Sequence, residues 1–291
     1  MNKKLLSLII LFISNFAQSA EITWDLFFDN IYNLPSIIMD FQGEKMPLIL
    51  DTGSKEALHL PIALINKIPN KTENSEKVRS IDLSGNIKEV RSFIVDRLEL
   101  DSFIFNNIQV LEYKSWGLFI SSDLTRSNPD KEEIDAENSV IGLGLFKDYV
   151  LTINYPENKI TISDSINISD DLNKNWISIP FYLNRNGLVI NMFDGLNNYE
   201  MILDTGATIS IIKEESLSPF SSKFTEPEDN FRYISLEMTD VANDKIKAVI
   251  IDSLPDEFES DGIIGFNFFR KNIVKIDFRN KQMWIHPVVT E

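Results

Sequence analysis

The chain has 291 residues, 43% of them hydrophobic, and a formal net charge of −16 at pH 7. This length and hydrophobic content are ample for a buried core, and the length favours two domains. The acidic balance argues against nucleic-acid binding, because a phosphate backbone would be repelled. The chain has no cysteine, which excludes thiol catalysis, and only two histidines, His59 and His286. Neither lies in a cluster typical of a zinc site or a His-based triad, so we expect ordinary surface or strand positions for both.

Residues 1–19 have the pattern of a secretory signal peptide. Lys3 and Lys4 precede the apolar run 5–13, and Ala17-Gln18-Ser19 places small residues where a signal peptidase reads them. No later segment approaches the ~20 apolar residues of a membrane span. We therefore expect an exported protein, periplasmic or secreted, whose mature chain has no membrane span.

The rest of the chain divides into a short leading segment and two mostly β halves. Residues 20–35 carry four aromatic side chains, so we expect this segment to pack on the body of the protein. The N-terminal half is predicted over 36–163 and the C-terminal half over 177–291. The polar stretch 164–176 is the predicted linker between them.

The first half reads as strands and hairpins. Residues 36–41 and 46–50 alternate as strands around a turn, and 80–95 reads as a hairpin whose turn is Ser84-Gly85-Asn86. A second hairpin is predicted over 98–113, turning at Asn106-Asn107, followed by a charged, exposed loop over 114–138. Matched spacings from Asp51 to Asp96 and from Asp204 to Asp252 predict that the first hairpins correspond. The hairpin 98–113 and the charged loop are then additions specific to the first half.

One motif occurs twice and organises both halves. Leu50-Asp51-Thr52-Gly53-Ser54 and Leu203-Asp204-Thr205-Gly206-Ala207 each end an apolar run with an acidic residue and turn formers. Each copy is followed by two apolar residues and a glycine, Val140-Ile141-Gly142 and Ile263-Ile264-Gly265. The strands that close the halves, 150–155 and 273–278, align without a gap. Each half therefore holds one carboxylate at the end of a strand.

Two such aspartates on equivalent loops would meet at the axis between the halves. Two carboxylates about 3 Å apart cannot both ionise and so share one proton. The pair then contains an acid and a base, which can activate a water against an amide carbonyl while protonating its oxygen. Gly53 and Gly206 would let the backbone approach the carboxylates, and the hydroxyls of Thr52 and Thr205 would tie the loops together. Ser54 is expected to donate a hydrogen bond to Asp51, which Ala207 cannot do for Asp204.

These motifs resemble those of aspartic peptidases of the pepsin and retropepsin superfamily, over residues 36–285. The resemblance implies a mainly β fold of two pseudo-symmetric closed-barrel lobes with an active-site cleft between them. It also implies an aspartic endopeptidase with Asp51 and Asp204 as catalytic residues, a protein or peptide substrate, and no cofactor or metal. The short halves are closer to two retropepsin-type units fused in one chain of a bacterial, exported type, so we expect a monomer.

The sequence departs from the pepsin pattern at two places. The candidate flap, with Ser84, Gly85 and Asn86 at its tip, lacks the tyrosine that pepsins carry there. Lys55 follows the first motif where pepsins have a small hydroxyl residue, and we expect it to face solvent. The alternative function is an exported binding or scaffold protein that keeps the fold without turnover, because fold alone does not establish activity.

Overall fold

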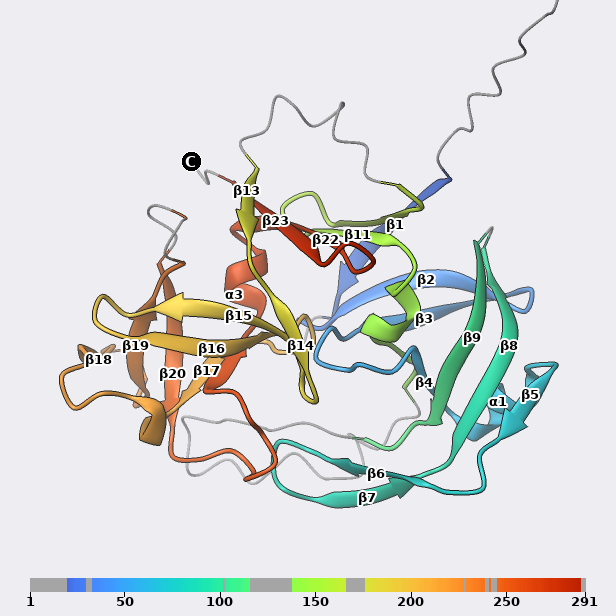
Figure 1. Cartoon of the computed structure of the whole chain (residues 1–291), viewed down its shortest axis with the longest axis horizontal. Helices are drawn as coiled ribbons and strands as arrows, with labels where there is room; N and C mark the ends of the chain where they lie inside the picture. The colour runs from blue at the N-terminus through green and yellow to red at the C-terminus, as the bar shows by residue number, and fades with distance from the viewer. Residues whose placement is uncertain are drawn as a thin grey trace, which may run out of the picture.

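The structure is a computed structural model that describes residues 20–29, 33–101, 103–115, 138–165, 176–227, 229–238, 241 and 245–288. The predicted signal peptide, most of the predicted linker and most of the predicted charged loop lie outside these residues. The described chain is mainly β with a few short helices (Figure 1). Within it, no helix combines the length and the apolar character that crossing a membrane requires.

The elements follow the predicted order closely. The first half contains β1 (Glu21–Phe28), β2 (Pro35–Phe41), β3 (Glu44–Leu50), β4 (Leu58–Leu60), α1 (Ile62–Lys67), β5 (Lys71–Glu73), β6 (Val78–Ile81), β7 (Ile87–Val90), β8 (Ser92–Leu100), β9 (Phe103–Glu112), β10 (Val140–Ile141), η1 (Leu143–Phe146), β11 (Val150–Asn154) and β12 (Lys159–Ser163). The second contains β13 (Ile177–Ile179), β14 (Tyr182–Asn184), β15 (Gly187–Phe193), β16 (Asn198–Leu203), β17 (Ser210–Lys213), η2 (Glu214–Ser216), β18 (Lys223–Thr225), β19 (Arg232–Leu236), β20 (Ile246–Ile251), β21 (Gly262–Ile264), α3 (Phe266–Phe269), β22 (Asn272–Asp277) and β23 (Gln282–Pro287).

Six strands in each half pair in the same order. The order is β2-β3-β10-β4-β9-β8 in the first half and β15-β16-β21-β17-β20-β19 in the second. The end strands of each series meet at one residue pair, Phe41 with Leu100 and Phe193 with Glu237, the residue after β19. The ring of hydrogen bonds is therefore uneven, and the expected closed barrels are seen only in part.

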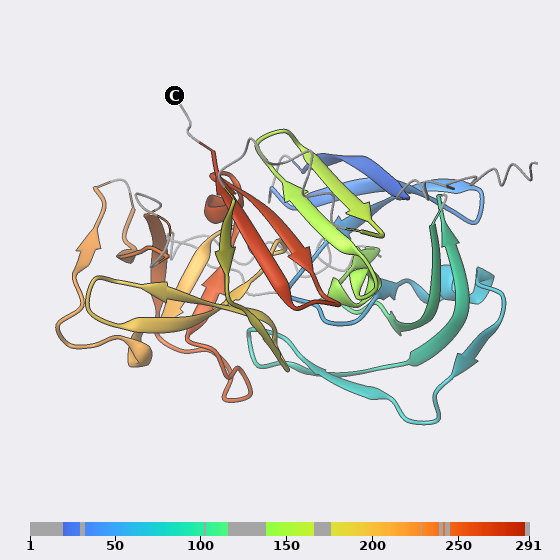
Figure 2. The ribbon, with the colours of Figure 1, turned by 45° about the horizontal axis from the view of Figure 1, so that its top comes forward.

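The two halves are joined by a continuous sheet in the order β13-β23-β22-β11-β12-β1 (Figure 2). The closing strands β11 and β22 pair directly and antiparallel, with Val150 opposite Asp277. The leading strand β1 pairs with β12 and with β2, and its side chains Trp24 and Leu26 are buried. The aromatic leading segment is thus a strand of the sheet that links the halves.

The structure corrects the predicted hairpins of the first half. The first hairpin is β6 with β7, and it ends at Val90; β8 then starts a different sheet. The second hairpin, β8 with β9, turns between Leu100 and Phe103 and not at Asn106-Asn107. Asn107 has a φ of 49° inside β9, but the register of the two strands is the same on both sides of it, so the asparagine pair lies within the strand and not in a turn.

This pairing also changes which hairpins correspond between the halves. Strand β9 runs parallel to β4, as β20 runs parallel to β17, so β8–β9 is the counterpart of β19–β20. The prediction from spacing, that hairpin 98–113 is specific to the first half, is therefore wrong. The hairpin without a counterpart among the described elements is β6–β7.

Candidate active site

Asp51 and Asp204 lie at equivalent strand ends. Strand β3 runs parallel to β10, and β16 runs parallel to β21. Each aspartate therefore lies beside the glycine that follows the neighbouring strand, Gly142 after β10 and Gly265 after β21. The amide of Asp51 donates to the carbonyl of Ile141, and that of Asp204 to the carbonyl of Ile264, each at 2.9 Å. The side chain of Asp51 is only 8% exposed. The duplicated motif thus produces the same local geometry twice.

Four hydrogen bonds through two threonines connect the loops. Thr52 Oγ1 donates to the carbonyl of Leu203 at 2.8 Å and accepts the amide of Thr205 at 2.9 Å. Reciprocally, Thr205 Oγ1 donates to the carbonyl of Leu50 at 2.8 Å and accepts the amide of Thr52 at 3.0 Å. Both threonines are buried. Each loop is therefore held by the backbone of the other, which fixes the separation of the aspartates.

The two carboxylates share a backbone donor. The amide of Gly53 lies 2.9 Å from Asp51 Oδ1 and 3.1 Å from Asp204 Oδ1, while the amide of Gly206 donates to Asp204 Oδ1 at 2.7 Å. A Cβ atom at Gly53 would lie 2.6 Å from Asp204 Cγ, and one at Gly206 would lie 2.9 Å from Asp51 Cγ. Only glycine allows this approach, and the structure brings the two predicted catalytic side chains together.

The electrostatics of the pair are unequal. Burial, followed by the charge of Asp51 and a hydrogen bond with its carboxyl group, raises the pKa of Asp204 well above its usual value. The amides of Gly206 and Gly53 oppose this rise by stabilising the charged form. Asp204 therefore keeps its proton at pH values where an ordinary carboxyl group is ionised.

A tyrosine that the sequence reading did not assign to the site lies beneath the pair. Tyr155 is fully buried, and its hydroxyl donates to the carbonyl of Thr205 at 3.4 Å. Burial, with smaller contributions from the charges of Asp204 and Asp51, raises its pKa well above the usual value. Tyr155 aligns with Phe278 in the closing strands, and its additional hydroxyl was the signal available in the sequence.

The residues after the first motif depart from expectation. Ser54 was predicted to donate to Asp51, but its hydroxyl lies 2.7 Å from His59 Nε2 and 3.4 Å from Glu56 Oε2. His59 is a strand residue, as expected, but it is buried. Lys55 is exposed, in agreement with the expected solvent-facing side chain. The equivalent of Ser54 in the second half, Ala207, packs against apolar side chains.

The flap candidates occupy the turn of the β6–β7 hairpin. Asp82 accepts hydrogen bonds from the amides of Ser84 and Asn86 at 3.0 and 2.9 Å, and Gly85 adopts a φ of +80°. These contacts explain why the turn contains a glycine flanked by short polar residues.

The hairpin reaches from the first half to the second (Figure 1). Leu83 at its tip packs against an apolar cluster of the second half that includes Leu254 and Phe258. Arg79 forms an ion pair with Glu257 at 3.7 Å. The hairpin therefore contacts both halves, as a flap over a site between them would.

No family model and no curated protein matches the sequence. Among solved structures, an aspartic proteinase from Irpex lacteus superposes with a TM-score of 0.53 over 92% of this chain and 98% of its own, at 13% identity. Basic 7S globulin from soybean superposes with a TM-score of 0.53 over 92% of this chain and 95% of its own, at 9% identity. At these identities the similarity concerns the fold alone. The chain has a mainly β fold of the kind seen in a pepsin-like aspartic proteinase.

Proposed function

We propose that the chain is an exported aspartic endopeptidase in which Asp51 and Asp204 hydrolyse peptide bonds. One observation carries this proposal: Gly53 donates to both carboxylates, and the threonines lock the two loops that bear them. Two buried carboxylates that face each other cost stability. An Asp-Thr-Gly turn with a purely structural role does not require that arrangement. The likeness to a solved aspartic proteinase supports the same assignment.

The geometry suggests how the work is divided. Burial and the charge of Asp51 raise the pKa of Asp204, so the pair as a unit keeps one proton at pH values where an isolated carboxyl group is ionised. In the proposed step Asp204 carries this proton and Asp51 is the carboxylate. Asp51 takes a proton from a water held between the two side chains, and the resulting hydroxide attacks the peptide carbonyl. Asp204 gives its proton to the carbonyl oxygen as the tetrahedral intermediate forms. No covalent enzyme intermediate is needed.

The test is digestion of an unfolded protein mixture from pH 3 to pH 8. Purified mature chain is compared with Asp51→Ala and Asp204→Ala, each checked for folding by thermal unfolding. Loss of either residue should abolish turnover, because the pair then lacks its acid or its base. Activity near the wild-type level in either variant would contradict the proposal.

The second candidate is a binding or scaffold protein that retains the fold. Two observations favour it: Leu83 and Arg79 hold the hairpin against the second half, and basic 7S globulin from soybean is among the solved structures with a similar fold. Under this alternative, the wild-type chain is inert across the pH range and remains inert when the hairpin is loosened by Leu83→Ala.

Export and a monomeric state are parts of the proposal that rest on the sequence. Both aspartates lie on one chain, so activity per mole should not fall on dilution. The N-terminal sequence of the protein isolated from its source should begin at Ala20 if cleavage follows Ser19.

A further inference from the structure

A buried histidine lies directly behind the loop that follows Asp51. His59, on β4, is 8% exposed, and its Nε2 lies 2.7 Å from Ser54 Oγ and 3.7 Å from Glu56 Oε2. Ser54 Oγ lies in turn 3.4 Å from Glu56 Oε2. The three side chains therefore form a closed triangle in which every corner contacts the other two.

The equivalent positions in the second half are apolar. His59 and Ile211 occupy the same register, since each pairs with the residue two positions before the glycine that follows β10 or β21. Ser54 and Ala207 correspond as well, because each offers its carbonyl to the first amide after that glycine. Ile211 and Ala207 belong to an apolar cluster. Apolar residues at these positions are therefore sufficient to form the fold. The polar triangle of the first half has a role other than forming the fold.

The triangle is rigidly coupled to Asp51 through the backbone. The amide of Ser54 donates to the carbonyl of Asp51 at 3.2 Å, and the carbonyl of Ser54 accepts from Leu143 at 2.8 Å. A Cβ atom at Gly142 would lie 2.3 Å from the carbonyl oxygen of Glu56, so the loop packs tightly against the chain after β10. A shift of Ser54 or Glu56 therefore displaces Asp51.

The position of the ring proton of His59 determines how the triangle is bonded. The Ser54 hydroxyl has a single proton. When Nε2 has no proton, it accepts that proton from Ser54. When Nε2 carries a proton, in either the neutral or the charged ring, it donates to Ser54, and the Ser54 proton is available to bond the Glu56 carboxylate. The second arrangement links all three side chains, and its bond to the carboxylate is charge-assisted.

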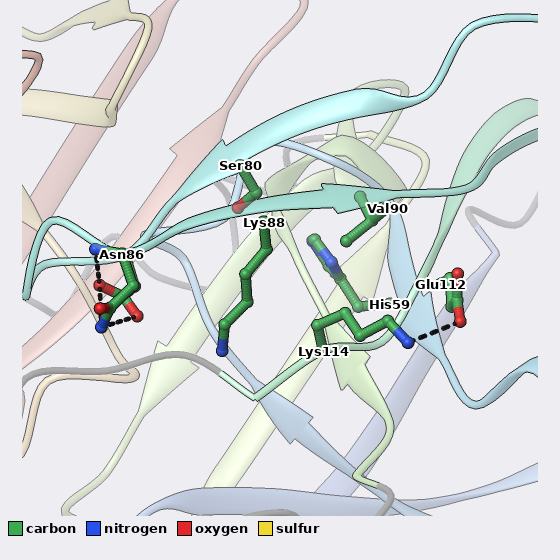
Figure 3. A pocket seen from close by; sticks show the side chains of 8 residues that line it. His59, Ser80, Asn86, Lys88, Val90, Glu112 and Lys114 are labelled. Carbon is green, nitrogen blue, oxygen red and sulfur yellow. Dashed lines mark hydrogen bonds and ion pairs between the residues drawn. The ribbon is translucent and has the colours of Figure 1, made fainter.

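Charged groups of the hairpin and of the end of β9 line a small pocket together with His59 (Figure 3). Glu56, from the loop after Asp51, contacts the histidine as well. The hairpin contributes Asp82, which binds amides of its own turn, and Lys88, which donates to the carbonyl of Ser115. The end of β9 contributes Glu112, which pairs with Lys114 at 2.9 Å. Asp82, Lys88, Glu112 and Lys114 thus bond to one another or to backbone groups, whereas Glu56 contacts the histidine.

We propose that His59 is a positioning residue: through Nε2 it ties Ser54 to Glu56 and so holds Asp51 at the position that the catalytic pair requires. This inference rests on the proposed function. Supporting evidence comes from Glu56. Burial would raise its pKa, but the hydrogen bond and the charge of His59, with smaller contributions from a backbone hydrogen bond and the charge of Lys55, outweigh burial and lower it. The histidine thus stabilises the charged form of this carboxyl group.

The activity test compares two replacements of the histidine. His59→Ile copies the second half and should lower kcat by roughly tenfold to a hundredfold with little change in KM, because Asp51 is displaced by up to ~1 Å. His59→Gln can still donate to Ser54 and should recover part of kcat. His286→Gln, the matched control, should leave kcat at the wild-type level.

A second measurement needs no activity. Carbon-detected NMR of the Glu56 carboxyl group should show its titration moving to higher pH in His59→Gln than in the wild type. If His59→Ile does not fold, Glu56→Gln replaces it and should lower kcat in the same way. Wild-type kcat in His59→Ile, no recovery of kcat in His59→Gln, or an unmoved Glu56 titration would each overturn the proposal. An inert wild-type chain with a shifted Glu56 titration would instead refute the proposed function and leave the His59–Glu56 link standing.

Discussion

Replacing Gly53 by alanine tests the close approach of the two loops. The added Cβ would lie 2.6 Å from Cγ of Asp204 and 2.6 Å from its Oδ2. Ordinary van der Waals contacts of a Cβ atom begin near 3.4 Å. The carboxylate cannot simply rotate away, because the amides of Gly206 and Gly53 both hold its Oδ1. The pair must therefore separate by close to 1 Å.

This displacement sets the size of the expected effect. A misplacement of about 1 Å in a catalytic group costs up to roughly 100-fold in rate. Overpacking of a tight site costs about 1–3 kcal/mol of unfolding free energy. Gly206→Ala is the matched comparison, since its Cβ would meet Asp51 Cγ at 2.9 Å and needs a smaller shift. We expect Gly53→Ala to lose more activity than Gly206→Ala.

The assay measures kcat and KM on a fluorogenic peptide chosen from the cleavage products of the digestion, alongside thermal unfolding. In both variants the loss should appear in kcat, because the change acts on the reacting groups and not on substrate binding. Equal activity of Gly53→Ala and the wild type would refute the reasoning. So would a greater loss in Gly206→Ala.

Three further outcomes are expected. Asp204→Asn should raise the unfolding temperature at pH 8 but not at pH 3. Because the pKa of Asp204 is raised in the folded protein, the stability that this group contributes at low pH is lost as the pH rises through that pKa, whereas the asparagine never becomes charged. An equal change in unfolding temperature at both pH values would contradict this. Thr52→Val should cost on the order of 3 kcal/mol by leaving a buried carbonyl and a buried amide unpaired, whereas Thr52→Ser should cost much less, as chemical denaturation would show. Leu83→Ala should raise KM about three- to tenfold with kcat nearly unchanged, because the hairpin loses an apolar contact of about 1 kcal/mol with the second half; an unchanged KM would argue against a flap.

Local patterns in the sequence were enough to predict most strands and the two carboxylates. An apolar run that stops at Asp-Thr-Gly specifies a strand and the turn after it, and its repetition predicts a second copy of the same geometry. Turn chemistry located the β6–β7 hairpin at Ser84-Gly85-Asn86. The same reasoning misplaced the turn of β8–β9, since a left-handed asparagine can lie in a turn or inside a strand, and only pairing with another strand distinguishes the two.

The sequence by itself determined which residues could carry the chemistry, because residue type and strand periodicity are local properties. Tertiary structure alone decided how β11 and β22 join the halves and where the hairpin tip rests. It also decided the partners of Ser54, which turns to His59, and it placed Tyr155 beneath the loops. Contacts of this kind depend on which strands lie side by side after long-range pairing, and spacing along the chain does not encode that choice.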